Sequence, residues 1–282
     1  QHHMCIRESL GVDIGGTKIK SGRVMGNRIV DTHLIEVNRD DSEEIALNKV
    51  FGAIDELMTD SIRAIGIGVP AVVDPDSGMV YDVQNIPSWT KVPLRRKVQD
   101  RYNVPVHINN DANCFALGEK HFGKAMGYSN CVALSLGTGL GMGILVDGKL
   151  YNGVLCGAGE VGMIPYKDGI MEHYAGSFFF DEKYGESAKA LFRKAMDKDK
   201  LALQAYKEYG VHLGEAIKAI LYMYAPQAIV LGGSISKAYA FFKESMHETL
   251  ISFAYQKQLE QTKIETSDLM DAPILGAAAL CL

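Results

Sequence analysis

The sequence lacks the features that mark membrane, secreted and disulfide-stabilised proteins. No apolar run is long enough to span a membrane. The chain does not start with a basic stretch followed by an apolar one, so we expect no secretory signal and a cytoplasmic protein. The cysteines form no Cys-x-x-Cys pair and mostly have apolar neighbours, which favours reduced thiols over a disulfide framework. They are Cys5, Cys114, Cys131, Cys156 and Cys281.

An excess of positive charge is also missing. The 29 Lys and Arg residues are outnumbered by 34 Asp and Glu residues, which gives a net charge of −5. This balance leaves no electrostatic footprint for nucleic acid or an anionic membrane, so we expect neither as a partner. With 282 residues, 47% of them hydrophobic, the chain can form one large or two medium domains. Gln1, His2 and His3 resemble the remnant of a purification tag.

A glycine-rich hairpin occurs twice in the chain. Residues 10–24 predict a strand, a Gly-Gly-Thr turn and a second strand, and residues 132–147 repeat this pattern when Gly15 is aligned with Gly137. A third glycine turn, at 232–234, follows another apolar strand. The N–H groups of such turns can bind phosphate, so the three together indicate a polyphosphate ligand. None has the pattern of a Walker A loop or of a dinucleotide-binding loop.

The remaining periodicity predicts two α/β halves of common plan with a cleft between them. Strands are predicted at 29–37, 62–69, 104–108, 229–231 and 263–266, and helices at 42–58, 93–102, 112–122, 177–196, 200–224, 236–255 and 273–282. Residues 70–89 are predicted to form a long polar loop, a kind of connection that is usually functional. We expect an N-terminal domain at 5–111, on which residues 272–282 pack back, and a larger C-terminal domain at 112–271.

Two aspartates stand where predicted strands end. The strand at 104–108 stops at Asn109, Asn110 and Asp111. A carboxylate at such a position can accept a proton from a substrate hydroxyl, although Asp111 or Asn110 could instead cap the next helix. Asp13 ends an apolar strand beside a glycine turn, where a carboxylate without a partner would be costly. A hydrated magnesium ion would suit it, because Mg²⁺ prefers carboxylate and phosphate oxygens and keeps several waters.

Five motifs follow one another in a fixed order. They are Asp13-x-Gly-Gly-Thr-Lys18, Asn109-Asn110-Asp111-Ala112-Asn113, Gly137-Thr-Gly-Leu-Gly141, Gly159-Glu160-x-Gly162 and Leu231-Gly-Gly-Ser234. From about Leu10 to its end, the chain thereby resembles the ROK family of bacterial sugar kinases, within the actin-like ATPase superfamily. The resemblance implies a two-domain α/β fold with a duplicated ribonuclease H-like unit and a central cleft for ATP and sugar. It implies a glucokinase-type transferase that phosphorylates glucose, an aminohexose or an N-acetylhexosamine.

The resemblance also implies a role for each matched residue. Asp111 would be the catalytic base, and the magnesium ion of the ATP would lie at Asp13, bound through water. The residues implied to bind ATP are Gly15, Gly16, Thr17, Lys18, Gly137, Thr138, Gly139, Gly232 and Gly233. Those implied to bind the sugar are Asn85, Asn110, Asp111, Glu160 and Glu172, the last through its match within residues 169–177. Amides and carboxylates suit this task because each sugar hydroxyl both donates and accepts hydrogen bonds.

The chain departs from the family pattern at one corner. The family usually has a histidine shortly after Gly-Glu-x-Gly, where this chain has Met163. It also usually has a cysteine-rich zinc cluster, where residues 164–171 contain neither Cys nor His. A structural zinc site needs about four sulfur or nitrogen ligands. We therefore expect no structural zinc and an altered sugar preference.

Two further expectations concern assembly and regulation. The family commonly dimerises, and the aromatic run at 178–180 fits an interface or a core, so we expect a homodimer. Some family members are transcriptional regulators with a DNA-binding segment ahead of the sugar domain. The first hairpin begins near the start of this sequence, and the charge is acidic, so we expect no such module. A sugar sensor without catalysis is the alternative, which the presence of both Asp13 and Asp111 disfavours.

Overall fold

Contacts within the chain divide it into two units. The computed structural model describes residues 8–282, so Gln1, His2, His3 and Cys5 lie outside the described residues. Of these described residues, the first unit holds 8–126, 150–158 and 269–282, and the second holds 127–149 and 159–268. The grouping keeps residues 112–126 with the first unit, whereas the domain boundary predicted at Asp111 assigns them to the second. That boundary stays a prediction.

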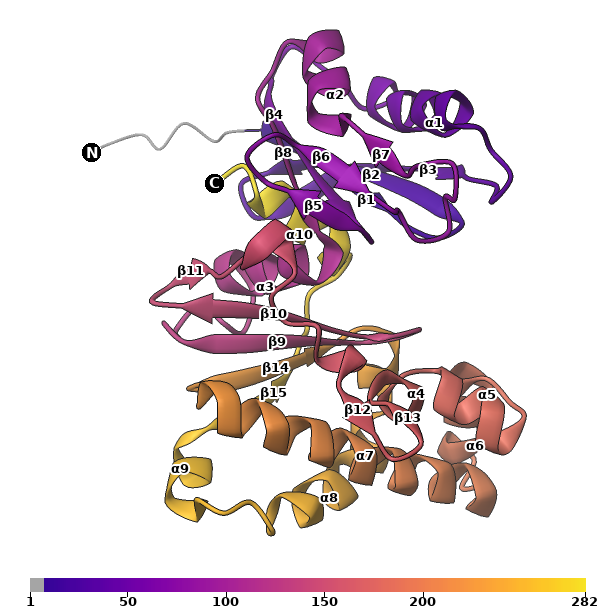
Figure 1. Cartoon of the computed structure of the whole chain (residues 1–282), viewed down its shortest axis with the longest axis vertical. Coiled ribbons are helices and arrows are strands. Elements are labelled where there is room, and N and C mark those ends of the chain that lie inside the picture. Colours follow the sequence, from indigo (N-terminus) through magenta and orange to yellow (C-terminus); the bar gives the residue numbers. More distant parts are fainter. Residues whose placement is uncertain (1–7) are drawn as a thin grey trace. The chain divides into compact units, whose positions relative to one another are not determined.

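The first unit is built on a five-stranded sheet (Figure 1). Its strands are β1 (Glu8–Ile14), β2 (Lys18–Met25), β3 (Arg28–Glu36), β4 (Ile62–Val69) and β8 (Val106–Asn110), in the order β3-β2-β1-β4-β8. The pairs β3/β2 and β2/β1 are antiparallel, and β1/β4 and β4/β8 are parallel. The carboxyl ends of three neighbouring strands therefore lie at one edge, where candidate residues 13, 109 and 110 stand.

Two pairs of helices pack on this sheet. Helices α1 (Glu43–Asp55) and α2 (Leu94–Tyr102) bury their apolar side chains in one core with the sheet. Helices α3 (Asp111–Phe122) and α10 (Ala272–Ala279) lie on its other face (Figure 1). Side chains at Gly11 and Gly66 would overlap the backbone of α10, so these glycines allow α10 to lie directly on β1 and β4. The predicted C-terminal helix thus packs on the first unit.

The predicted loop at 70–89 is in part a small sheet. Strands β5 (Val72–Asp74), β6 (Met79–Tyr81) and β7 (Lys91–Val92) pair antiparallel in that order. Val73, Val80 and Val92 are buried in it. Each strand has only two or three residues, too few to show an alternating pattern in the sequence. The loop prediction was therefore wrong for β5 and β6, which form a packed layer with β7.

The second unit repeats the strand order of the first. Its sheet contains β9 (Cys131–Leu136), β10 (Leu140–Val146), β11 (Lys149–Leu150), β14 (Ala228–Gly232) and β15 (Lys263–Thr266), in the order β11-β10-β9-β14-β15. The β9/β10 pair is antiparallel, and β9/β14 and β14/β15 are parallel, as in the first sheet. The hairpin repeat predicted from the glycine pattern is confirmed.

The helices of the second unit differ from the prediction in two places. The helix expected at 177–196 is two helices, α5 (Phe178–Tyr184) and α6 (Ala188–Met196), because Gly185 adopts a φ of 67° and ends α5. The helix expected at 236–255 begins as a 3-10 turn, η3 (Ser234–Ala238), and continues as α8 (Tyr239–Leu250). Helix α9 (Gln256–Gln261) was not predicted. Helix α7 (Lys200–Tyr224) was predicted with these bounds and packs on α8.

Short elements follow β11 in the chain. They are η1 (Val154–Cys156), η2 (Val161–Met163), the strands β12 (Pro165–Tyr166) and β13 (Gly169–Ile170), and α4 (Glu172–Ala175). Strands β12 and β13 form a two-stranded hairpin that leads into α4. The candidate sugar ligands Glu160 and Glu172 lie on this run of short elements.

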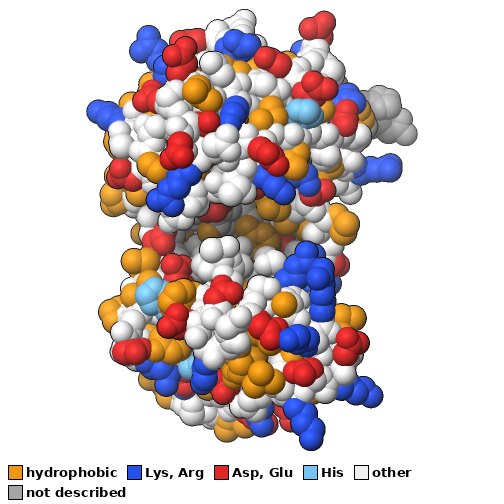
Figure 2. All heavy atoms as spheres, turned by 90° about the vertical axis from the view of Figure 1, so that its right-hand side faces the viewer, with side chains coloured by type: hydrophobic (Ala, Val, Ile, Leu, Met, Phe, Trp, Pro, Cys, Tyr) orange, Lys and Arg blue, Asp and Glu red, His pale blue; other side chains and the backbone are white. Residues whose placement is uncertain are grey.

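The surface bears on the expected partners. None of the helices described between residues 8 and 282 is both long and apolar enough to cross a membrane. On the face shown in Figure 2, Lys and Arg side chains are interspersed with Asp and Glu.

In the aromatic run at 178–180, Phe179 and Phe180 are core residues, and Phe178 is 47% exposed. Two of the three aromatics are thus used inside the second unit, and a homodimer stays a prediction.

Candidate functional site

In the first unit, Asp13 and Asp111 form a pair of interacting carboxylates. Asp13 lies one residue before the end of β1 and opposite Lys20 of β2. Burial and the negative charge of Asp111 raise the pKa of Asp13 to about 7, against an opposing effect of Lys20. A divalent cation at Asp13 would offset the unfavourable burial of its negative charge. Among residues 8–282 no group of three or more His, Cys, Asp or Glu side chains is placed to hold a metal. A hydrated Mg²⁺ needs only one or two carboxylates besides phosphate oxygens, so Asp13 fits it.

Asp111 begins α3 directly after β8. Its side chain is exposed, and its Oδ1 accepts a hydrogen bond from the backbone N–H of Ala112 (2.9 Å). Asn110 is the N-cap of the same helix, and its Oδ1 accepts from the same N–H (3.0 Å). The capping role considered from the sequence is therefore real for Asn110. The Asp111 side chain is nevertheless exposed to solvent.

A network of asparagines fixes the corner between β8 and α3. Asn109 Nδ2 donates to Asn152 Oδ1 (2.8 Å), and Asn113 Nδ2 donates to Asn109 Oδ1 (2.9 Å). Asn109 and Asn113 are 4% and 1% exposed, so these bonds are made away from water and hold the corner firmly. No role is predicted for Asn152 from the sequence. A single Asn beside Gly153 is typical of an ordinary turn, so the sequence does not indicate its contact with Asn109.

The first glycine turn lies against Asn85. The backbone N–H of Gly15 donates to the carbonyl of Lys18 (2.8 Å), which closes the turn between β1 and β2. A methyl group at Gly16 would lie 2.8 Å from Asn85 Nδ2. Only glycine lets the two segments approach this closely. The structure therefore brings Gly15, Gly16, Thr17 and Asn85 together within the first unit.

In the second unit, Glu172 lies against the second glycine turn. Glu172 Oε2 accepts a hydrogen bond from the backbone N–H of Leu140 (3.2 Å), just after the turn. A methyl group at Gly139 would lie 2.6 Å from the same carboxylate oxygen. The backbone N–H of Ser177 donates to the carbonyl of Gly137 (2.9 Å). A predicted sugar ligand is thus in contact with a predicted phosphate loop.

Glu160 stands close to Glu172. Partial burial raises the pKa of Glu160, and the negative charge of Glu172 raises it further. The backbone around Glu160 is tightly turned, because Gly159 has a φ of 98° and η2 follows at once. The second unit therefore holds two neighbouring carboxylates beside the glycine turn, as the predicted sugar-binding set requires.

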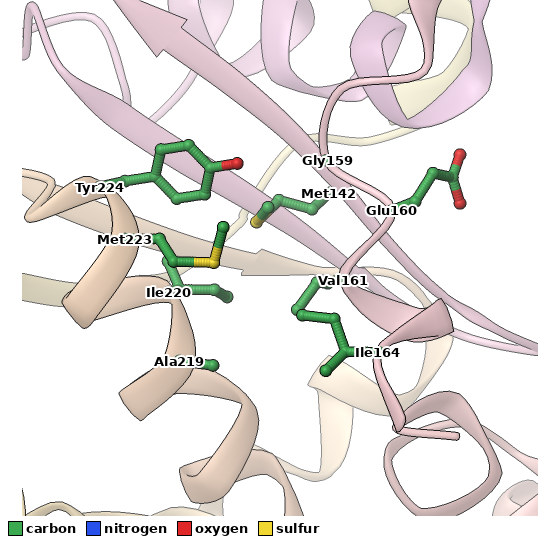
Figure 3. A pocket seen from close by; sticks show the side chains of 9 residues that line it. All are labelled: Met142, Gly159, Glu160, Val161, Ile164, Ala219, Ile220, Met223 and Tyr224. Carbon is green, nitrogen blue, oxygen red and sulfur yellow. The ribbon is translucent and has the colours of Figure 1, made fainter. Parts of the chain in front are cut away.

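A cavity of about 170 Å³ lies on the other side of the Gly159–Val161 backbone. Figure 3 shows the side chains of Met142, Val161 and Met223 pointing toward this cavity, while the Glu160 carboxylate points away from it. Its lining is mostly apolar. Of the residues predicted to bind a sugar, Glu160 alone is among those that line the cavity.

The third glycine turn lies beside the second. Gly232 ends β14, and Gly233 has a φ of 82°. A side chain at Gly233 would overlap the backbone of Leu136, the last residue of β9. A methyl group at Gly137 would meet Ser234 Oγ at 3.9 Å. The structure thus brings the turns at 137–139 and 232–234 together at one edge of the second sheet.

The region where relatives are expected to bind zinc is folded without zinc-ligand residues. Residues 164–171 form β12, β13 and the turn between them. Met163, where the family usually has histidine, is 57% exposed at the end of η2. The absence of structural zinc stays a prediction.

Comparisons with known proteins match nearly the whole chain. The model of the family described as the ROK family matches residues 9–282. The chain is 30% identical to a glucokinase from Thermotoga maritima, over 96% of this chain and 96% of the relative. It is 28% identical to a xylose repressor from Bacillus subtilis, over 97% of this chain and 77% of the repressor. Among solved structures, it is similar to a ROK family glucokinase from Streptomyces griseus in complex with glucose and AMPPNP. That TM-score is 0.81, with 26% identity over 97% of this chain and 98% of the other. The predicted two-domain, actin-like α/β fold is confirmed.

Proposed function

Because the chain belongs to the ROK family, we propose that it is an ATP-dependent sugar kinase that phosphorylates a hexose hydroxyl, with Asp111 as the general base. The observation that carries this proposal is the interaction of the exposed Asp111 carboxylate with the partly buried Asp13, at the carboxyl ends of β8 and β1. The similarity to a glucokinase that was crystallised with glucose and AMPPNP supports it. Phosphoryl transfer needs mainly positioning and charge neutralisation, with modest help in deprotonating the acceptor.

The proposed roles of the first unit concern the reacting groups. Asp111 accepts the proton of the attacking sugar hydroxyl, and Asn110 helps to orient that hydroxyl. One positioned carboxylate accelerates such a step by roughly 10²–10⁴-fold. Asp13 would hold Mg²⁺ through water, and the ion would offset the negative charge of the phosphates. Gly15, Gly16 and Thr17 would donate to phosphate oxygens, with Lys18 adding positive charge.

The proposed roles of the second unit concern ATP and sugar. Gly137, Thr138 and Gly139 would donate to phosphate oxygens, and Gly232 and Gly233 would border the adenosine. Glu160 and Glu172 would accept hydrogen bonds from sugar hydroxyls, as Asn85 would in the first unit. Met163 is apolar and at most a weak acceptor. We therefore expect weak glucose binding or a preference for a sugar with an amino or acetamido group at C2.

A sugar-responsive regulator is the second candidate. The observation that favours it is the similarity to a xylose repressor, which is 28% identical over 97% of this chain. A sensor must bind its sugar but needs no base and no metal carboxylate. The presence of both Asp13 and Asp111 favours the kinase. Release of ADP across a panel of hexoses and aminohexoses separates the two.

Asp111→Asn tests the assignment of the base. We expect kcat to fall at least ~100-fold, because the amide cannot accept the proton, while sugar binding measured by calorimetry changes less than about threefold. Asp100→Asn is the matched control, since Asp100 is 73% exposed in the same unit and lies 3.7 Å from Arg96 Nε. More than a few per cent of wild-type turnover in Asp111→Asn would contradict the assignment. No ADP release from the wild type with any sugar would contradict the kinase.

A further inference from the structure

The β12–β13 hairpin is joined to α7 by a cluster of aromatic rings. The cluster consists of Tyr166 in β12, Tyr174 in α4, Phe179 in α5 and His212 in α7. Their ring centroids lie 5.2 Å apart for Tyr166 and Tyr174, 5.0 Å for Tyr174 and His212, and 5.3 Å for Phe179 and His212. Edge-on contacts at these distances are favourable for aromatic rings. Four separate elements therefore meet at His212.

One hydrogen bond ties the hairpin directly to the long helix. The Tyr166 hydroxyl and His212 Nδ1 are 2.9 Å apart. Burial raises the pKa of Tyr166 to about 12 and lowers the pKa of His212 to about 4. Near neutral pH the bond therefore joins a neutral phenol to a neutral imidazole. Such a bond needs no metal and no counter-ion.

The same cluster holds α4, and α4 in turn holds the second glycine turn. Tyr174 is in α4, and its hydroxyl donates to Asp168 in the hairpin turn. Tyr209, one helical turn before His212, donates from its hydroxyl to the carbonyl of Ala175 at the end of α4 (2.9 Å). Two tyrosines thus fix α4 from both sides. Its first residue is Glu172, which accepts from Leu140.

The chain after α4 makes a second contact with the glycine turn. The backbone N–H of Ser177 donates to the carbonyl of Gly137, and the Ser177 hydroxyl lies 3.5 Å from the carbonyl of Thr138. A methyl group at Gly176 would lie 2.8 Å from the same Thr138 carbonyl. The segment 172–177 is therefore hydrogen-bonded at both ends of the turn. Its own position depends on the aromatic cluster.

We propose that Tyr166 and His212 are positioning residues, which hold segment 172–177 so that Glu172 serves the sugar and the phosphate turn at once. The proposal rests on the proposed function for the ligands involved. Glu172 Oε2 accepts from Leu140, and Oε1 would accept from a sugar hydroxyl. A sugar bound to Glu172 is then linked, through one carboxylate, to the turn that would bind ATP. The cluster supplies a fixed frame for this link in a region without zinc ligands.

Tyr166→Phe is the first test, because it keeps the ring and removes the hydroxyl. We expect AMPPNP binding, measured by calorimetry without turnover, to weaken about 3–10-fold, since a lost hydrogen bond loosens the turn. Sugar binding weakens by a similar factor. Tyr239→Phe is the matched control, because Tyr239 makes the corresponding contact with His247 (3.5 Å) on α8 of the same unit. We expect unchanged binding in that variant.

Replacement of His212 provides a rescue test. His212→Gln keeps a polar group that can pair with the Tyr166 hydroxyl, and we expect it to retain most AMPPNP binding. His212→Leu should lose as much as Tyr166→Phe, and the double variant should lose no more than either single one. Equal binding in wild type, Tyr166→Phe and His212→Leu would overturn the proposal. Equal loss in His212→Gln and His212→Leu would also overturn it.

Replacement of Glu172 tests the link itself. Glu172→Ala should weaken the binding of both AMPPNP and the sugar. Glu182 is an exposed residue of α5, so Glu182→Ala should change neither affinity. Weakening of the sugar alone would show that Glu172 does not position the turn, and would overturn the proposal. These are binding measurements, so they keep their meaning even if Asp111→Asn contradicts the proposed base.

Discussion

The two units share one strand order but hold their glycine turns by different means. In the first unit the turn is closed by its own backbone, from Gly15 N–H to the carbonyl of Lys18. In the second unit the corresponding turn is also held by the carboxylate of Glu172, 32 residues after Leu140 in the chain. The second turn also has a bond of its own backbone, from Gly137 N–H to the carbonyl of Gly139 (3.2 Å), so the carboxylate of Glu172 is an additional contact.

The two units also differ in the charge that they place beside the turn. Alignment of Gly15 with Gly137 puts Asp13 of the first unit opposite Ser135 of the second. Asp13 is partly buried and interacts with a second carboxylate, Asp111, whereas Ser135 carries no charge. Duplication of the fold thus keeps the turn and changes its chemistry. The proposed reacting groups belong to the first unit.

The largest expected effect is a difference in kcat between a variant of Asp13 and a variant of Ser135. Asp13→Asn should lower kcat at least ~100-fold at saturating MgATP, because the amide is a poor substitute for a carboxylate near the hydrated ion. Ser135→Ala should change kcat less than about threefold. Without metal, Asp13→Asn should melt no lower than the wild type, since it removes a charge that burial disfavours. Equal losses of kcat in the two variants would remove the distinction between the units.

Acid should loosen the second unit through His212. Burial lowers the pKa of its imidazole from 6.5 to about 4 in the folded chain, and the charges of Lys167, Glu208, Lys183 and Glu215 act on it with opposing signs. The unfolded chain therefore binds more protons between these values, so stability is full above pH 6.5 and falls toward pH 4. The loss is at most ~3 kcal/mol, reduced where water screens the ring.

Urea unfolding at pH 7 and pH 4.5 measures this loss. His212→Gln cannot be protonated, so its stability should fall less between the two pH values than that of the wild type. His247→Gln on α8 is the control. Burial lowers the pKa of His247 less than that of His212, so we expect a smaller difference in stability between this variant and the wild type. A wild type and a His212→Gln variant that lose the same stability would contradict this expectation.

A smaller effect compares the two turns directly. A methyl group at Gly16 would press on Asn85, and one at Gly139 on Glu172. Each of Gly16→Ala and Gly139→Ala should raise the KM for ATP about 10-fold, and Gly139→Ala should also raise the KM for the sugar. Gly127→Ala is the control, since its methyl group meets nothing within 4 Å. A normal KM for ATP in both variants would count against phosphate binding by the turns.

For removal of zinc we expect no effect on stability. Incubation with a zinc chelator should leave the melting temperature unchanged, because Tyr166 and His212 join the hairpin at 165–170 to α7, and residues 164–171 contain no Cys or His that could bind zinc. Elemental analysis should find well below one zinc per chain. One tightly held zinc per chain would refute the expectation and would question the role given to the cluster.

Much of the fold was predictable because its signals are local. The strands β1, β4 and β14 are apolar runs that stop at polar or glycine residues, and α7 has a long helical periodicity. Asp13 and Asp111 could be chosen because they follow such runs. The strands of the small sheet, of two or three residues each, and the break at Gly185 were missed. The small sheet depends on pairing between its strands, as of Val73 with Val80 and of Val80 with Val92.

The sequence by itself determined the duplicated hairpin, the family and the set of candidate residues, since each depends on residue types at short spacing. Tertiary structure alone decided that Asn109 bonds to Asn152, that Glu172 bonds to Leu140, and that Tyr166 meets His212. These partners are 43, 32 and 46 residues apart. Contacts at such separations form only when packing of the sheets and helices brings distant segments together, because no local pattern of residues encodes the distance between them.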